Sequence, residues 1–316
     1  MSEPTLAPGE SVAALTQRAA AVRGTHSVIW ISGSDATSFL DGLLSQSVAA
    51  TGPDAVRRSL LLTPQGKMRA LLWLLGGQSD KIGLVTQRST AELVVADLTR
   101  FRFRVDAEIE TDQRSVVALV GPGAPEALRA AGLDSPGTGW QTLPEGLIAA
   151  VPFTNSDLPR FVLVGEPADL VVDVVPEVGK EAYEAVRIAA GEPLGTVDFD
   201  DSTISQELGA VDDAVDFTKG CYLGQELVAR IDSRGRVNRT LRAVVVPGHV
   251  ALVGSMLASE DKEVGIVTSA ASSVVTDETI GLALIRREVS DEAPVTAVAP
   301  DGELVGIVHA LPLGWF

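Results

Sequence analysis

The chain has 316 residues, a formal net charge of −17 and 46% hydrophobic residues, which is enough for a large core and favours two or three domains over one. So acidic a surface disfavours nonspecific binding to nucleic acid or to anionic membranes. The single cysteine excludes an internal disulfide and any Cys-x-x-Cys site, and the N-terminal residues lack a basic start followed by an apolar run. We therefore expect a cytoplasmic protein with no membrane-spanning segment.

The first two thirds of the chain predict alternating strands and helices. Strands are expected where apolar, β-branched runs lie between turn residues, at 27–32, 59–63, 67–75, 115–120 and 161–164. Helices are expected where apolar residues recur at helical spacing, at 35–44, 89–100, from Pro125 onward and at 180–190. Ser89 and Glu92 have the spacing of a capping box at the head of the second helix. The pattern indicates two similar α+β lobes.

After Arg242 the pattern changes to short β-branched runs between glycine, proline and polar turns. Strands are expected at 243–246, 264–267, 280–285, 295–298 and 304–309. Several short strands without helices predict a small antiparallel β-barrel. We place the boundary near Asn238, with one domain at 1–237 and the barrel at 238–316.

Few side chains suit catalysis. The three histidines, His26, His249 and His309, lie in no metal-ligand spacing and beside no candidate nucleophile, and the chain has neither a Walker loop nor a dinucleotide-binding glycine pattern. Cys221 differs, because neighbouring glycines favour a tight, exposed turn and Lys219 places a cation two residues away. An isolated cysteine is more often a small buried hydrophobe, but these flanks favour a functional thiol.

The residues around Cys221 form a polar cluster within a basic segment. Tyr222, Gln225 and Glu226 are donors and acceptors next to a flexible turn, a composition that suits a polar ligand. Residues 219–242 contain six basic side chains against two acidic ones. An anion would neutralise this excess, and so would the acidic run at 198–216 if it folds back onto the segment; both interpretations stay open.

Residues 219–226 (KGCYLGQE), followed by Arg234-Gly235, resemble the signature K-G-C-Y-x-G-Q-E of the YgfZ family and its mitochondrial relatives in iron–sulfur cluster maturation. The motif is long and contains a rare cysteine, so the resemblance is specific. Further similar segments occur in the expected order at 28–44, at 60–69 (LLLTPQGKMR), at 187–193 (RIAAGEP) and at 264–269 (VGIVTS).

The resemblance implies an α+β fold: the two-lobed folate-binding module of the glycine cleavage T-protein plus a C-terminal antiparallel β-barrel, around a central cavity for a reduced folate. It implies tetrahydrofolate or a derivative as cofactor, no stably bound metal, and iron–sulfur client or assembly proteins as partners. His26 and Tyr183 fall where family members have aromatic residues that line the cavity. Cys221 becomes the candidate functional thiol, and the remaining implied folate contacts are Arg187, Lys219, Tyr222, Gln225, Glu226, Arg230 and Arg234.

The chain departs from T-proteins at two places. Ala189 stands where T-proteins have a glutamate that binds the pterin ring, and residues 86–93 (TQRSTAEL) lack the asparagine and catalytic aspartate of their helix head. We therefore expect a folate-dependent accessory factor rather than an enzyme, and a one-carbon transferase if it is an enzyme. The alternatives are a tetrahydrofolate-dependent aminomethyltransferase and, less favoured by the net charge and by 4% aromatic residues, an RNA-binding module.

Overall fold

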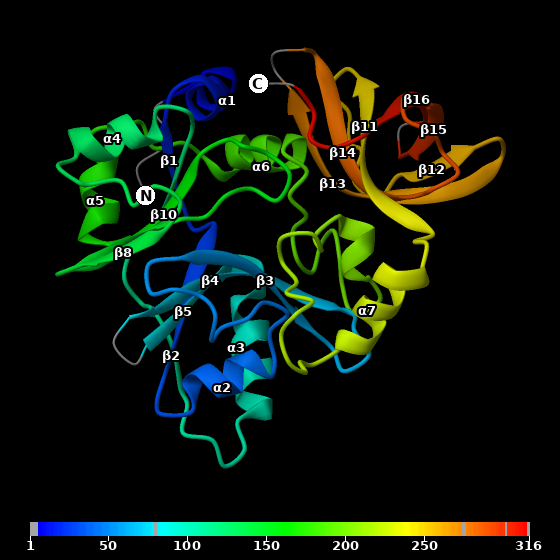
Figure 1. The fold of residues 1–316 in the computed structure, drawn as a ribbon. Coiled ribbons are helices and arrows are strands. Elements are labelled where there is room, and N and C mark those ends of the chain that lie inside the picture. Colours follow the sequence, from blue (N-terminus) through cyan, green and yellow to red (C-terminus); the bar gives the residue numbers. More distant parts are fainter. Residues whose placement is uncertain (1–5, 79–80, 274–275, 301, 315–316) are drawn as a thin grey trace.

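The computed structural model describes residues 6–78, 81–273, 276–300 and 302–314. The described chain has three parts, two sheet-containing lobes and a barrel, arranged like a clover leaf (Figure 1). Lobe 1 contains a five-stranded sheet with the order β1-β7-β10-β9-β8, and lobe 2 one with the order β3-β4-β5-β2-β6. The third part is a closed barrel with the order β11-β14-β13-β12-β15-β16. The α+β fold with a C-terminal barrel is thus confirmed.

Helices cover both faces of the lobe 1 sheet. Its strands are β1 (Ala20–Arg23), β7 (Val116–Val120), β8 (Trp140–Leu143), β9 (Gly146–Ala150) and β10 (Arg160–Gly165). One face packs against α4 (Ala124–Ala130) and α5 (Glu166–Val172). The other face packs against α1 (Pro8–Gln17) and α6 (Lys180–Ala189). The buried residues on the two faces alternate along each strand, as the pleat of a sheet requires.

Lobe 2 is inserted into lobe 1. Its strands are β2 (His26–Ser32), β3 (Val56–Leu62), β4 (Met68–Gln78), β5 (Lys81–Gln87) and β6 (Glu108–Thr111). Two helices cover one face of the sheet, α2 (Ala36–Asp41) and α3 (Ala91–Phe101), and the 3-10 turn η1 (Arg88–Thr90) leads into α3. The opposite face packs against the lobe 1 sheet. Strand β1 pairs with β7, although the whole of lobe 2 separates them in the sequence.

The barrel encloses its own apolar core. Its strands are β11 (Arg239–Pro247), β12 (Met256–Ser259), β13 (Lys262–Ser273), β14 (Glu278–Arg286), β15 (Pro294–Ala299) and β16 (Gly302–His309). Its first strand begins at Arg239, and the domain boundary near Asn238 stays a prediction. A connecting segment with η2 (Ser205–Leu208) and α7 (Gln225–Arg234) links it to the lobes.

The sequence did not indicate several elements, among them β5 of lobe 2, β8 and β9 of lobe 1, and β12, the sixth strand of the barrel. The head of α3 also lacks the expected capping box: Thr90 is the N-cap residue, and the hydroxyl of Ser89 donates to the carbonyl of Gly195 at 3.3 Å instead. Ser89 therefore connects lobe 2 to the segment that follows α6.

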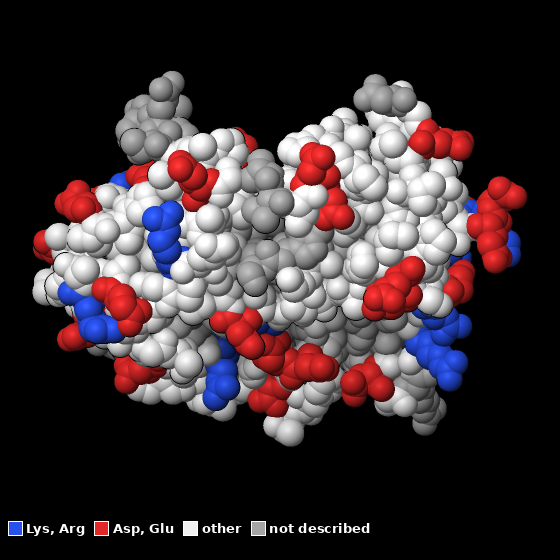
Figure 2. Space-filling view, turned by 90° about the horizontal axis from the view of Figure 1, so that it is seen from above, with Lys and Arg blue, Asp and Glu red and all other residues white. Residues whose placement is uncertain are grey.

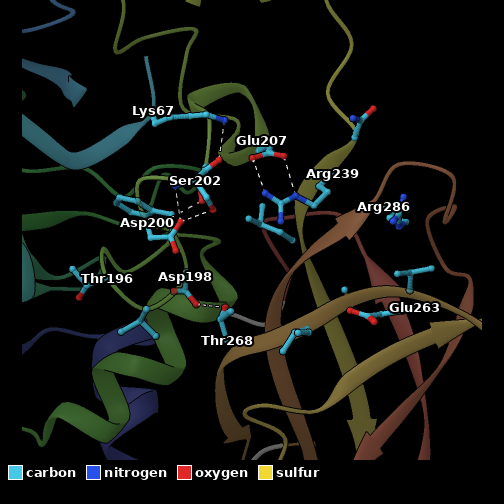
Figure 3. A pocket seen from close by; sticks show the side chains of 18 residues that line it. Lys67, Thr196, Asp198, Asp200, Ser202, Glu207, Arg239, Glu263, Thr268 and Arg286 are labelled. Carbon is cyan, nitrogen blue, oxygen red and sulfur yellow. Dashed lines mark hydrogen bonds and ion pairs between the residues drawn. The ribbon is translucent and has the colours of Figure 1, made fainter. Parts of the chain in front are cut away.

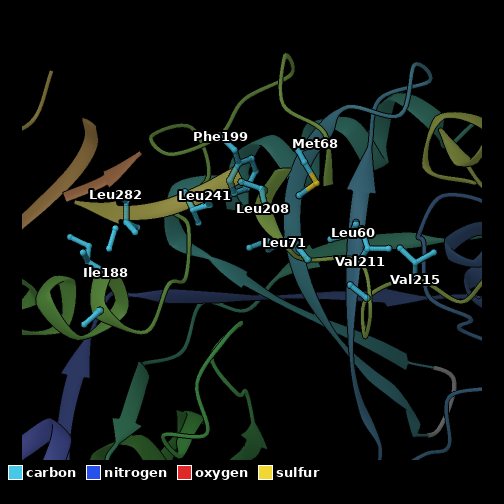
Figure 4. Packing of buried hydrophobic residues seen from close by; sticks show 14 of the residues in the cluster. Leu60, Met68, Leu71, Ile188, Phe199, Leu208, Val211, Val215, Leu241 and Leu282 are labelled. Atoms are coloured by element: carbon cyan, nitrogen blue, oxygen red, sulfur yellow. The ribbon is translucent and has the colours of Figure 1, made fainter. Parts of the chain in front are cut away.

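A central apolar cluster joins the three parts (Figure 4). Leu60 and Leu71 come from the lobe 2 sheet, Ile188 from α6, and Leu241 and Leu282 from the outer face of the barrel. Residues of the connecting segment between 199 and 215 fill the space between them. Burial of so much apolar surface, at roughly 25 cal/mol per Å², fixes the lobes and the barrel against one another.

A buried arginine adds directional contacts to this junction. Arg187, near the C-terminal end of α6, is only 1% exposed. Its guanidinium donates to the carboxylates of Glu184 at 2.8 Å and Asp198 at 2.9 Å, and to the carbonyl oxygen of Glu192 at 3.0 Å. It also donates to the hydroxyl of Ser269 on β13 at 2.8 Å. One side chain therefore connects lobe 1, the segment after α6 and the barrel.

Asp198 extends the network into the barrel. Its second carboxylate oxygen accepts a 2.6 Å hydrogen bond from the hydroxyl of Thr268 on β13, and its first also accepts from the backbone N–H of Leu194 at 2.7 Å. The carboxylate is buried, so these bonds replace the water that it loses. Asp198 is consequently the main counter-charge that Arg187 needs.

We predict that Asp198→Ala lowers the free energy of unfolding by about 3–5 kcal/mol, because it leaves the charge of Arg187 buried without its main partner. Denaturant titration measures the loss. The matched control is Glu126→Ala, which breaks an exposed pair with Arg129 and is expected to cost less than about 1 kcal/mol. Losses of similar size in the two variants would show that the network does not hold the barrel on lobe 1.

Candidate functional site

The loop at 219–226 is anchored to lobe 2 through Lys219. Its buried ammonium donates to three carbonyl oxygens just beyond or at the C-terminal end of α2: Asp41 at 2.7 Å, Leu44 at 2.8 Å and Gln46 at 3.0 Å. The Asp41 carboxylate lies 3.3 Å away. A lysine has three donors, so all are used. This cation therefore satisfies carbonyl groups that the short helix leaves open.

Two glycines hold the other end of the loop against the β3–β4 turn. Gly224 has φ +82°, and a Cβ there would lie 2.6 Å from the carbonyl oxygen of Thr63. Gly66, with φ +74°, is equally close to Leu227, since its Cβ would lie 2.6 Å from that of the leucine. The backbone N–H of Leu223 also donates to the carbonyl of Gly42 at 3.0 Å. The loop is thus fixed on both sides of Cys221.

Cys221 is exposed, as the glycine-flanked motif predicted. The adjacent Tyr222 packs against the central cluster, where burial raises its pKa to about 12. Its backbone N–H donates to the side-chain oxygen of Gln225 at 3.2 Å, which orders the turn before α7. Glu226 and Arg230 are exposed on α7. A lone thiol is therefore presented to solvent from a rigid support.

Half of the basic segment is neutralised within the chain. Lys219 pairs with Asp41 as described, Arg239 forms a two-bond pair with Glu207 at 3.0 and 3.2 Å, and Arg242 pairs with Asp291 at 2.9 Å. Part of the preceding acidic run, Glu207, thus folds back onto the segment. Arg230 and Arg236 are exposed, and the side chain of Arg234 lies outside the described part of the structure.

The second group of candidate residues lies where lobe 1 meets lobe 2. Arg160 is fully buried and forms an ion pair with Glu192 at 2.7 Å. It also donates to the hydroxyl oxygen of Tyr183 at 2.6 Å, and its guanidinium lies 5.1 Å from the centre of the Trp73 ring. Burial is the main reason that the pKa of the Tyr183 phenol is raised. The phenol is therefore a neutral hydrogen-bond partner.

His26 completes this group and has an unsatisfied ring nitrogen. Its ring meets those of Trp73 and Tyr183 edge-on, at 5.9 and 6.4 Å between centres. Nδ1 lies 2.9 Å from the hydroxyl of Thr25, whereas Nε2 is buried without a hydrogen-bond partner. Burial, and secondarily the charge of Arg160, keep the pKa of His26 well below its usual value. Buried polar atoms normally have a partner, so Nε2 is an exception within this buried group.

A hollow of about 370 Å³ opens beside this group. Tyr183, Arg187 and Glu192 contribute to its buried floor, and Arg88, Ser89 and Lys180 are among the residues around it. The volume lies within the usual range for small-molecule sites. An aromatic ring, a carboxylate and several donors match the mixed chemistry of a pterin, so the residues present fit a reduced folate.

A larger hollow, of about 710 Å³, contains none of the predicted site residues (Figure 3). It lies between the connecting segment, the β3–β4 turn and the barrel. Its charged side chains are largely engaged: Lys67 donates to the carbonyl of Ser202 at 2.9 Å, and Arg239 binds Glu207. The smaller hollow is the candidate binding site, because it is lined by predicted site residues, Tyr183 and Arg187, together with further charged side chains.

The predicted site residues thus form two groups. Tyr183 and Arg187 line the smaller hollow, His26 is buried against the Tyr183 ring, and the others lie on the loop and α7. Both adjoin the central cluster, through Ile188 of α6 and through Tyr222. Within the described residues, no His, Cys, Asp and Glu side chains form a group that could hold a metal ion. No helix in the same part of the chain is long and apolar enough to cross a membrane.

Sequence reasoning missed the two residues that define the floor of the smaller hollow. Glu192 lies inside the segment at 187–193, and Arg160 begins β10, but their ion pair joins positions 32 residues apart. An arginine at the start of an otherwise apolar strand was the available signal, because a charge there requires a buried partner.

No family model matches the chain. It is 30% identical to the tRNA-modifying protein YgfZ of Edwardsiella ictaluri (strain 93-146) over 230 residues, which cover 67% of this chain and 66% of that protein. It is 26% identical to the mitochondrial iron–sulfur cluster assembly factor IBA57 of Homo sapiens, over 92% of this chain and 83% of the human protein. The chain thus spans about two thirds of the length of the bacterial relative.

A solved structure shares the fold across nearly the whole chain. The glycine cleavage system aminomethyltransferase T from Bartonella henselae has a TM-score of 0.83 with 19% identity, over 98% of this chain and 90% of that one. At this identity the similarity establishes the fold alone.

We predict that the stability of the protein falls as the pH drops below about 6.5, and that His26 causes part of this loss. The folded-state pKa of His26 is lowered, so the unfolded chain binds the extra proton between that pKa and about 6.5. One such group contributes a slope of at most about 1.4 kcal/mol per pH unit. Urea titrations at several pH values should show a flatter profile for His26→Phe than for wild type.

The control is His249→Gln, which removes a half-exposed imidazole from the barrel surface. If His26→Phe retains the full wild-type slope, the buried imidazole is not the group that titrates.

Proposed function

Because the chain belongs to the YgfZ family, within the superfamily of the glycine cleavage aminomethyltransferases, we propose that it is a tetrahydrofolate-binding accessory factor that supports the assembly or repair of iron–sulfur clusters in client enzymes. The observation that carries the proposal is the exposed thiol of Cys221, fixed between two anchored ends of the family motif. A thiol held in this way can meet iron or a sulfur species on another protein without reordering the loop.

A single thiolate has limited capacity for clusters. Iron–sulfur clusters are normally held by four thiolates, and this chain has one cysteine. Cys221 therefore acts together with ligands of a partner, and the contact is transient. This role agrees with an accessory factor rather than with a protein that stores a cluster.

The folate occupies the smaller hollow beside α6. The ring of Tyr183 offers an aromatic contact for the pterin, and Glu192 and Lys180 offer polar partners in the same hollow. When bound, a reduced folate supplies a carrier for one-carbon units. Arg88 and Lys180, which line the same hollow, add positive charge that suits a polyglutamate tail.

Two features disfavour an aminomethyltransferase. Ala189, at the position of the T-protein glutamate, is buried in the central apolar cluster, where an unpaired carboxylate would be costly. The turn before α3 presents the hydroxyls of Ser89 and Thr90 in place of a catalytic aspartate, and both are already hydrogen-bonded within the chain.

We predict that the protein binds tetrahydrofolate with micromolar affinity and that Ser89→Trp weakens binding at least tenfold, because the larger side chain enters the smaller hollow. Calorimetric titration measures both affinities. Ser38→Trp is the control, since this exposed serine lies on α2 and does not line the hollow. No heat of binding at millimolar tetrahydrofolate would refute folate binding, and equal affinities in both variants would place the folate elsewhere.

We further predict that Cys221→Ala changes the free energy of unfolding by less than about 0.5 kcal/mol, because the side chain is exposed. The activity of iron–sulfur enzymes should nevertheless fall in cells that carry only this variant. Tetrahydrofolate affinity serves as the internal control and should stay at the wild-type value. Full enzyme activity in such cells would remove the thiol from the proposed function.

A further inference from the structure

We propose that the outer face of the barrel at β13, β12, β15 and β16 is a docking surface for a protein partner whose apolar contact area is bordered by lysine and arginine. The inference goes beyond folate binding and beyond the thiol, since it concerns neither the smaller hollow nor Cys221.

The surface consists of four exposed apolar side chains on adjacent strands. Met256 of β12 is the register partner of Ile266 on β13 and of Val298 on β15. Directly opposed residues point to the same face of a sheet with Cβ atoms about 5 Å apart, so the three side chains form a continuous row. Val305 on β16 lies diagonally from Val298, because its partner is Thr296. The exposed fractions are 37% for Met256, 48% for Ile266, 39% for Val298 and 65% for Val305.

The barrel buries its other apolar outer face completely. Leu241 on β11 and both Ile280 and Leu282 on β14 point outward into the central cluster, where the lobes cover them. The barrel thus has two apolar outer faces, and the lobes cover only one. Contiguous exposed apolar residues on a folded protein commonly mark a contact surface. The exposed row at Met256 therefore has the properties of a contact surface for another protein.

The charges around the row indicate which partner fits. Glu303 is the register partner of Val298, Glu263 is that of Ala258, and both glutamates are exposed. Residues 251–316 contain ten acidic side chains and three basic ones. Acidic side chains also predominate over the face seen in Figure 2. A basic rim on the partner is attracted to this surface, whereas a second copy of the chain or a nucleic acid is repelled.

The row also continues to the larger hollow. Ile266 and the half-exposed Val197 both line that hollow, together with Lys67 of the β3–β4 turn. The neighbouring Gly66 contacts Gly224 of the Cys221 loop. A partner bound to the row would therefore lie next to the larger hollow on its barrel side. The β3–β4 turn, which contacts the Cys221 loop, lies on the opposite side of that hollow.

The experiment places a photo-crosslinking amino acid at Met256 of the full chain and, as a control, at Phe103, which is 75% exposed on lobe 2. After irradiation in cells of the source organism, mass spectrometry identifies the protein joined through each position. The protein captured through position 256 is then purified, and its affinity for the wild-type chain is measured by calorimetry. We expect a partner with net positive charge that is captured from position 256 and not from position 103.

Substitutions then test the surface with this purified partner. Met256→Asp should weaken binding at least tenfold, Phe103→Asp should leave it unchanged, and raising the salt from about 50 to about 500 mM should weaken it further through screening. Val305→Asp, at the most exposed position of the row, provides a second variant if Met256→Asp fails to fold. Tetrahydrofolate affinity should be unchanged in both, which separates this surface from the folate site.

Four outcomes would overturn the proposal. These are capture from both positions alike, capture of a second copy of the chain, capture of an acidic protein or of RNA, and the absence of any product at position 256. Binding of the purified partner that Met256→Asp and Val305→Asp leave intact would have the same consequence.

Discussion

The arrangement of the three parts depends on the buried charge of Arg187. A guanidinium stays ionised at any physiological pH, so its burial requires acceptors in fixed positions. Asp198 and Glu192 supply them from the segment after α6, and Ser269 supplies one from the barrel. The apolar cluster brings the parts together, but apolar contacts have no direction. The arginine therefore determines the orientation in which lobe 1 meets the barrel, and with it the floor of the smaller hollow.

The eight residues of the family motif both attach the loop to lobe 2 and expose a thiol to solvent. Lys219, Leu223 and Gly224 attach the loop to lobe 2, whereas Cys221 between them faces solvent. The basic side chains of residues 219–242 also divide into two kinds. Arg239 forms an ion pair with Glu207 within the chain, whereas Arg230 is exposed to solvent. A motif of this kind identifies a family by residues that hold the backbone as much as by residues that meet a ligand.

The sequence predicted the elements whose signal is local. The apolar runs that became β2, β4 and β10, and the exposed turn at Cys221, follow from periodicity and glycine placement. Strand β12 escaped because Met256–Ser259 is short and has no β-branched residue. The acceptors of Lys219 are 173 to 178 residues away in the sequence, and the pair of Arg160 with Glu192 joins separate elements. Such contacts exist only after the lobes have packed, so no local pattern reveals them.

The insertion of lobe 2 between β1 and β7 determines the order in which the lobes can fold during translation. Strand β1 (Ala20–Arg23) emerges early but has no partner until β7 (Val116–Val120) has been made. Lobe 2, whose strands lie between them, can close its own sheet first. Because translation proceeds at about 5–20 residues per second, the N-terminal strand waits for several seconds. During that interval the unpaired apolar strand is open to pairing with other chains, so the nascent chain is exposed to aggregation until β7 has been made.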